Sequence, residues 1–282
     1  MAPLSYCHVV NQSDSVIRLD VYAMFWKCIV ITMLVGAAVF SSVDSCISAQ
    51  KDSEILVSAA ISLKDAFEEI GSMFEKQTGV RVRFNLGASG LLQKQIETGA
   101  PVDVFASAGE KQMDELQAQG LIVEETRRNL AQNVLVLVVP TGSQLSLHSF
   151  EELARSEVTK VAIGNPKTVP AGHYAQEALR NLGLWDRLQS RLVLSENVRQ
   201  VLDYVARGEV EAGIVYASDV PAAHGKTVIA AYAPKGSHDP IVYPIAVVKG
   251  TGNRSFATRF IDLTLSSAGQ AILVKNGFLS SR

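Results

Sequence analysis

The sequence predicts an α/β protein with two lobes, each built from a mostly parallel sheet flanked by helices. From Glu54 onward, short apolar segments alternate with amphipathic segments, which is typical of parallel strands joined by helices. A second series of the same kind follows the apolar segment 133–140, which we expect to cross between the lobes. The chain has 282 residues, 48% of them hydrophobic, and can therefore bury a substantial core.

The first series contains three strand-helix pairs. Its strands are predicted at 55–60, 80–88 and 102–108, because these segments are apolar or alternate between polar and apolar residues. Its helices are predicted at 62–79, 89–99 and 109–120, each of which ends at a glycine or a glycine-containing turn.

The second series begins with a helix from Ser149, for which the sequence SFEE indicates a capping box. Further elements are predicted in the order strand, helix, strand, helix and three strands, with a helical region at the C-terminus: 160–164, 171–183, 191–195, 195–206, 212–216, 227–233, 241–250 and 253–278. Residues 50–132 with about 243–282 are assigned to lobe I, and about 133–242 to lobe II.

A hydrophobic segment near the N-terminus is interpreted as a signal peptide. The apolar run from Cys28 to Phe40 is short for a membrane span but has the usual length of a signal-peptide core. The sequence ISA, ending at Ala49, is an acceptable cleavage site, so residues 1–49 are the predicted leader. Residues 1–23 are interpreted as an upstream extension, with Met24 as an alternative start.

The mature protein, from Gln50 onward, is expected to be periplasmic. Two alternatives stay open at this point: the leader is retained as an anchor, or a lipid is attached at Cys46, after the sequence VDS. All three cysteines lie before the predicted cleavage site, so the mature chain would have no disulfide, cysteine metal site or catalytic thiol.

Charge and motifs exclude several classes of function. The formal net charge is −2 and no basic block is present, which argues against a nucleic-acid partner. The histidines at 148, 173, 224 and 238 lack metal-site spacing, and no cofactor is predicted. The sequence GASG at 87–90 lacks the final glycine of a nucleophile elbow. An enzyme is therefore not expected; a hydrolase using Ser62 or Ser89 is the alternative from another class.

Four predicted helix starts follow the carboxyl ends of strands, where ligands bind in open α/β sheets. They lie at Ser62, at Ser89, at Ala171-Gly172 and at Glu196-Asn197-Val198. A helix start has unpaired N–H groups and a partial positive charge, so several of them could bind an anion without Lys or Arg. Taken singly, Ser62 and Ser195 are also ordinary helix caps. If Ser195 caps the amide of Val198, that amide is less available to a ligand.

The sequence resembles the periplasmic molybdate-binding proteins of ABC importers. The resemblance extends from about Ile55 to Phe278 and depends on motifs in family order: AAISLKDAFEEIGSMFEKQTG, ASGLLQKQIETGAPVDVFASA, VPAGHYAQEALRNLGLW and NVRQVLDYVARGEVEAGIVYASD. It implies a type II periplasmic binding fold, in which two lobes close on a tetrahedral oxyanion. The implied partners are molybdate or tungstate and a membrane ABC permease, and the protein is expected to be a monomer.

The resemblance implies a ligand that is held by uncharged hydrogen-bond donors. Molybdenum would be bound only as the molybdate anion, through these same donors. The matching positions are two hydroxyls, two backbone amides and one phenol: Ser62, Ser89, Ala171, Val198 and Tyr216. Pro170 and Gly172 would orient the Ala171 amide, with Gly172 leaving room for the oxyanion. A sulfate, thiosulfate or other small-oxyanion binding protein is the alternative in the same class.

Overall fold

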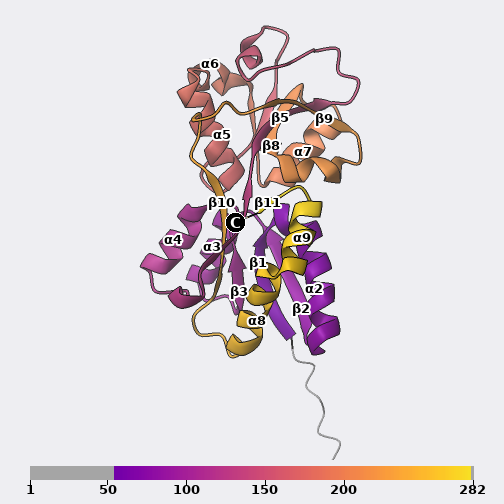
Figure 1. The fold of residues 1–282 in the computed structure, drawn as a ribbon. Helices are drawn as coiled ribbons and strands as arrows, with labels where there is room; N and C mark the ends of the chain where they lie inside the picture. Colours follow the sequence, from indigo (N-terminus) through magenta and orange to yellow (C-terminus); the bar gives the residue numbers. More distant parts are fainter. Residues whose placement is uncertain (1–53, 281–282) are drawn as a thin grey trace, which may run out of the picture. The chain divides into compact units, whose positions relative to one another are not determined.

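A computed structural model describes residues 54–280. The predicted signal peptide, the cleavage before Gln50 and the lipid at Cys46 lie outside this range. Within it, six strands form the first sheet in the order β11 (Leu279–Ser280), β4 (Arg128–Asn133), β10 (Ile241–Val247), β3 (Val104–Ala106), β1 (Glu54–Ala60) and β2 (Arg81–Gly87) (Figure 1). Strands β1, β2 and β3 are parallel, whereas β10 is antiparallel to both β3 and β4.

In the same described range, a second sheet has five strands in the order β7 (Leu192–Ser195), β6 (Val161–Gly164), β8 (Ala212–Tyr216), β5 (Leu135–Pro140) and β9 (Thr227–Tyr232). The neighbours β7, β6 and β8 are parallel, and β5 pairs antiparallel with β8 and β9. We call the first sheet with its helices the first lobe and the second sheet with its helices the second lobe.

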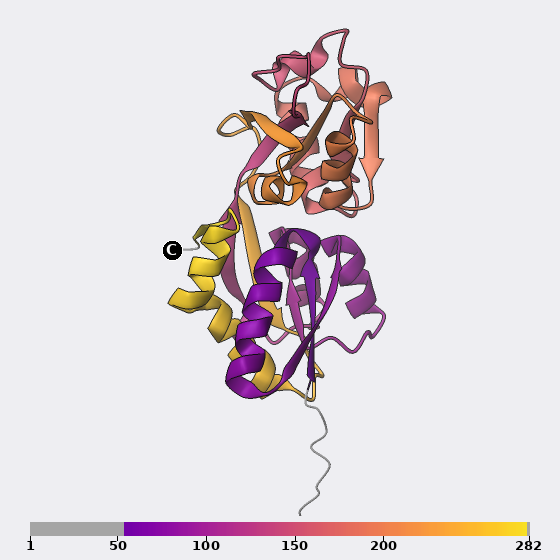
Figure 2. The same cartoon turned by 90° about the vertical axis from the view of Figure 1, so that its right-hand side faces the viewer.

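Helices flank both sheets. Those of the first lobe are α2 (Lys64–Thr78), α3 (Ser89–Glu97), α4 (Glu110–Ala118), α8 (Arg254–Leu265) and α9 (Ser267–Lys275). Those of the second lobe are α5 (Pro170–Asn181), α6 (Trp185–Leu188) and α7 (Val198–Ala206). Figure 2 shows α2, in indigo, beside the two yellow helices α8 and α9. Within residues 54–280, no helix combines the length and apolar character needed to cross a membrane.

Helix α2 illustrates how the sequence directs this arrangement. Its apolar residues Phe67, Ile70 and Phe74 are at most 1% exposed. The rings of Phe67 and Phe74 pack edge-on against Phe260 of α8, with centroids 5.7 and 5.6 Å away. Gly79 ends the helix in the left-handed conformation, with φ of 71°, which glycine adopts without steric cost.

The predicted α/β class is confirmed, but two predicted elements differ. The segment 133–140 is divided at Val134: β4 ends at Asn133 in the first sheet, and β5 begins at Leu135 in the second. The helix predicted from Ser149 is only a short 3-10 helix, Glu151–Ala154, without a side-chain cap. Glu152 instead accepts a hydrogen bond from the backbone N–H of His148, so the predicted capping box is wrong.

Candidate functional site

The five predicted site residues line one small cavity between the two sheets. Two belong to the first lobe and three to the second: Ser62 after β1, Ser89 at the start of α3, Ala171 in the first turn of α5, Val198 at the start of α7 and Tyr216 at the end of β8. None of them is more than 3% exposed. The structure thus brings all five together, and their role in binding a ligand remains a prediction.

The cavity has no charged side chain in its lining. Besides the five residues, the lining consists of small or apolar residues: Ala60, Ile61, Gly87, Ala88, Ala108, Val169 and Pro170. The helix starts of α3, α5 and α7 meet here because each follows a strand whose carboxyl end lies at this edge of its sheet. Their partial positive charge makes the cavity suited to a small anion.

Gly172 has a different role from the predicted one. A methyl group built on Gly172 would lie 2.0 Å from the carbonyl oxygen of Gly164, at the end of β6. The missing side chain therefore allows α5 to pack directly on β6. The prediction that Gly172 leaves room for a ligand was wrong, because that space is filled by the backbone of the neighbouring strand.

Helix α7 is capped by Asn197 and not by Ser195. The side-chain oxygen of Asn197 accepts a hydrogen bond from the N–H of Gln200 at 3.0 Å. The hydroxyl of Ser195 is buried and has no hydrogen-bond partner. Ser195 therefore does not cap the amide of Val198, which was the condition for its competing with a ligand.

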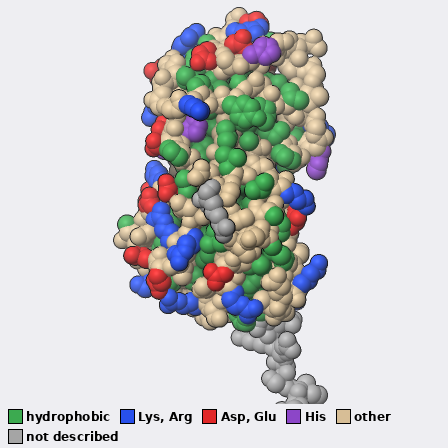
Figure 3. Space-filling view, viewed as in Figure 1, with side chains coloured by type: hydrophobic (Ala, Val, Ile, Leu, Met, Phe, Trp, Pro, Cys, Tyr) green, Lys and Arg blue, Asp and Glu red, His purple; other side chains and the backbone are tan. Residues whose placement is uncertain are grey.

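His173, in the first turn of α5, is exposed and is not part of the cavity lining. Within residues 54–280, no group of three or more His, Cys, Asp and Glu residues is placed to hold a metal ion. On the face shown in Figure 3, basic and acidic side chains are interspersed.

The family model described as "Bacterial extracellular solute-binding protein" matches residues 55–279. The chain belongs to this family. Its members are solute-binding proteins and not enzymes, which decides against the serine hydrolase considered above.

Known proteins similar to this solute-binding protein include the following three. A protein of Bacillus subtilis (strain 168), named as the ABC transporter substrate-binding lipoprotein YvgL, is 39% identical over 258 residues, which cover 91% of this chain and 97% of the relative. The molybdate-binding protein ModA of Escherichia coli (strain K12) is 38% identical over 231 residues, or 80% of this chain and 89% of the relative. The solved periplasmic molybdate-binding protein of Azotobacter vinelandii has a TM-score of 0.73 and 29% identity, and covers 81% of this chain and 100% of its own.

The two lobes of the solute-binding protein are joined by hydrogen bonds beside the cavity. The hydroxyl of Tyr216 donates to the carbonyl of Ala108, in the first lobe, at 3.0 Å. The N–H of Gly90 donates to the carbonyl of Thr168, in the second lobe, at 3.0 Å. Burial raises the pKa of Tyr216 well above its usual value, so the phenol remains protonated. Its hydrogen is directed at Ala108 here, and donation to a ligand would require an exchange of this bond.

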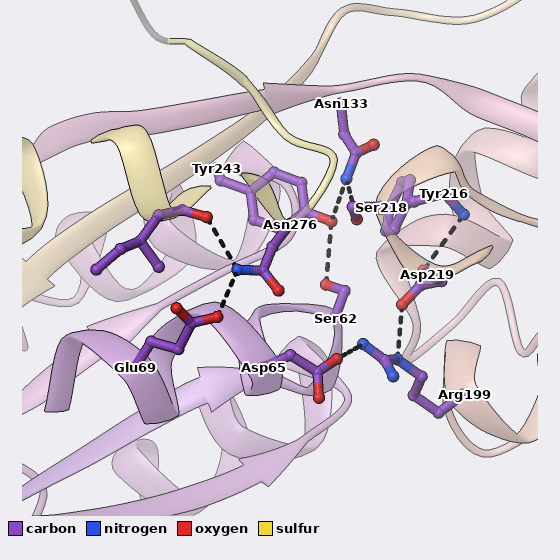
Figure 4. A network of polar contacts seen from close by, with 11 residues as sticks. Ser62, Asp65, Glu69, Asn133, Arg199, Tyr216, Ser218, Asp219, Tyr243 and Asn276 are labelled. Carbon is purple, nitrogen blue, oxygen red and sulfur yellow. Dashed lines mark hydrogen bonds and ion pairs between the residues drawn. The ribbon is translucent and has the colours of Figure 1, made fainter. Parts of the chain in front are cut away.

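An ion pair also joins the lobes at the edge of the cavity (Figure 4). Arg199 of α7 contacts the carboxylate of Asp65, on α2, at 2.7 Å and that of Asp219, which follows β8, at 2.9 Å. Asp219 is fully buried, and its burial raises its pKa to about 6, while Arg199 opposes that shift. Arg199 thus compensates a buried carboxylate and bridges the lobes through a half-exposed one.

These interlobe residues were missed in the sequence. Arg199 and Asp219 lie inside the motifs NVR and GIVYASD, next to Val198 and Tyr216, so their proximity to the predicted site was a usable signal. Thr168 and Ala108 act through their backbone, which leaves no signal in the residue type.

Proposed function

We propose that this solute-binding protein captures molybdate in the cavity between its lobes and delivers it to a membrane ABC importer. Two relatives that are named molybdate-binding protein ModA, 37% and 38% identical over 80% of the chain, support this ligand. The sequence motifs of the resemblance fall on the residues that line the cavity.

The observation that carries the proposal is the convergence of helix starts and serine hydroxyls in a cavity without charged side chains. Neutral donors can balance a dianion and still permit its release, whereas Lys or Arg would bind it with a full opposite charge. Most of the residues that line the cavity are buried with the lobes in this arrangement. The ligand would therefore enter when the lobes separate and bind as they close.

Selectivity follows from the same chemistry. A cavity lined by donors has no acceptor for an anion that carries a proton, so hydrogen phosphate should be rejected. Tungstate, which has the same shape and charge as molybdate, is the second proposed ligand. Sulfate is smaller and would be discriminated by the size of the closed cavity.

The proposed location is the periplasm, with a lipid anchor at Cys46 as the alternative. The family consists of extracellular solute-binding proteins. The proposed partner is the permease of a molybdate importer, and the protein is proposed to act as a monomer. No resident cofactor is proposed, because molybdate is the transported ligand.

Isothermal titration of the chain from Gln50 onward with molybdate, tungstate, sulfate and phosphate tests the proposed function. We expect tight binding of the first two anions and little heat from the others. If only sulfate gave binding heat, the proposed site would stand, but its ligand would be sulfate and not molybdate. If none of the four anions gave binding heat, the proposal would be contradicted.

The substitution Tyr216→Phe removes the phenol hydroxyl and should weaken molybdate binding by about 1–3 kcal/mol. The loss has this size because a hydrogen bond to a charged acceptor contributes about 1.5–3 kcal/mol, and without the phenol the dianion is left one donor short. Titration of the variant and of the unmodified protein with molybdate measures this loss. Tyr204→Phe, which removes a hydroxyl bonded to Gln200 on α7, is the matched control. Unchanged affinity of Tyr216→Phe would remove Tyr216 from the site.

A further inference from the structure

The hydroxyl of Ser62 is hydrogen-bonded to a buried tyrosine, Tyr243, that does not line the cavity. The hydroxyl oxygens of Ser62 and Tyr243 lie 3.0 Å apart, and Tyr243 belongs to β10 of the first sheet (Figure 4). Tyr243 is fully buried and Ser62 is 3% exposed. The ring of Tyr243 packs against those of Tyr216 and Phe278, with centroids 5.7 and 5.3 Å away, so its position is well defined.

Asn133 decides the direction of the hydrogen bonds in this cluster. Its side-chain oxygen accepts from the N–H of Val134 at 2.9 Å, which directs its NH₂ group toward two other residues. That group donates to Ser218 Oγ at 2.8 Å and to the hydroxyl oxygen of Tyr243 at 3.2 Å. Because an amide NH₂ can only donate, the oxygen of Tyr243 is an acceptor here.

The phenol of Tyr243 keeps one hydrogen of its own to donate. Among the hydrogen bonds of Tyr243 that are no longer than 3.5 Å in residues 54–280, the bond with Ser62 Oγ is the one that can accept this hydrogen. If Ser62 donated instead, the buried phenol hydrogen would lack a partner, which is unfavourable. The oxygen of Ser62 therefore accepts from Tyr243, and the hydrogen of Ser62 is left for the cavity.

Ser89 is arranged in the same way through a backbone donor. The N–H of Ala108 donates to Ser89 Oγ at 3.0 Å, and Ser89 is fully buried. In both serines a fixed donor occupies the oxygen, so the hydroxyl hydrogen can be presented to a ligand. For Ser89 the backbone supplies this donor, but for Ser62 it depends on one side chain.

We propose that Tyr243 is a positioning residue that holds Ser62 as a hydrogen-bond donor toward the oxyanion. The proposal rests on the proposed function and adds a residue to its site. Without the phenol, the hydroxyl of Ser62 can turn to other acceptors. The protein then loses part of its affinity for a fully deprotonated anion. The role is confined to Ser62, which gives it a specific signature in binding.

A double-mutant cycle between Tyr243 and Ser62 tests this inference in the purified protein, with molybdate titrated by calorimetry. Tyr243→Phe keeps the ring contacts and should bind molybdate about 10-fold more weakly than the unmodified protein. In the Ser62→Ala background, the same change should alter the affinity by less than about twofold, because the hydroxyl that Tyr243 orients is gone. Tyr204→Phe should bind as the unmodified protein does.

The outcomes separate this inference from the proposed function. An equal loss of affinity in both backgrounds would mean that Tyr243 acts through the fold in general, and would overturn the inference. Unmodified affinity in Tyr243→Phe would overturn it as well. If the unmodified protein itself binds no molybdate, the proposed function fails, and the cycle repeated with the anion that does bind tests Tyr243 independently.

Discussion

Replacing Gly90 with alanine is expected to weaken molybdate binding by about 30- to 150-fold, or about 2–3 kcal/mol. A methyl group built on Gly90 would lie 2.6 Å from the carbonyl oxygen of Thr168 and 3.0 Å from its Cα. Gly90 lies in the first lobe and Thr168 in the second, and both contacts are to backbone, which cannot move aside as a flexible side chain can. The methyl group should therefore hold the lobes apart and disfavour the closed form that binds the ligand.

Titration with molybdate measures the affinity of Gly90→Ala, and two controls show whether a loss of affinity comes from the contact between the lobes. Alanine is a better helix former than glycine, and Gly90 lies inside α3, so the variant should not lose stability within its own lobe. The melting temperature of the ligand-free variant should accordingly change little. Gly252→Ala, where a methyl group would meet nothing within 4 Å, should bind normally. Normal binding by Gly90→Ala would show that the closed form in solution does not bring Gly90 against Thr168.

The class of fold could be predicted because each strand and helix carries its own periodic pattern. The division of the segment 133–140 could not, because the apolar run gives no local sign of a break at Val134. The break is fixed by partners distant in the sequence. Asn133, at the end of β4, hydrogen-bonds Ser218 and Tyr243, which lie 85 and 110 residues further along the chain.

In the candidate site, too, the sequence predicted what local motifs encode and did not predict contacts between distant segments. The residues that line the cavity follow motifs, and the motifs placed them at helix starts that the structure brings together. The choice between Ser195 and Asn197 as the cap of α7 was beyond the sequence, since both residue types cap helices well. Contacts such as Gly90 with Thr168 depend on how two lobes approach each other, which no local pattern encodes.

Replacing Gly172 with alanine should destabilise the protein by about 3 kcal/mol, which corresponds to a fall in melting temperature of about 6–12 °C. A methyl group at this position would overlap the carbonyl of Gly164, with its oxygen 2.0 Å and its carbon 2.4 Å away. Helix α5 would have to move off β6, although Pro170, Ala171, Ala175 and Ala178 pack it into the core of the second lobe. Ala171 lines the cavity and would move with the helix, so molybdate affinity should fall together with stability.

The combination of both losses separates this role from the one first predicted for Gly172. If the glycine only left room for a ligand, Gly172→Ala would lose affinity and keep its melting temperature. Close packing of α5 on β6 requires that both fall, as followed by thermal unfolding without ligand and by titration with molybdate. Gly252→Ala, an exchange of the same kind in open space, should change neither quantity. A ligand-free melting temperature equal to that of the unmodified protein would contradict the packing role, because a contact of 2.0 Å between a methyl group and a backbone carbonyl cannot be accommodated without displacing the helix.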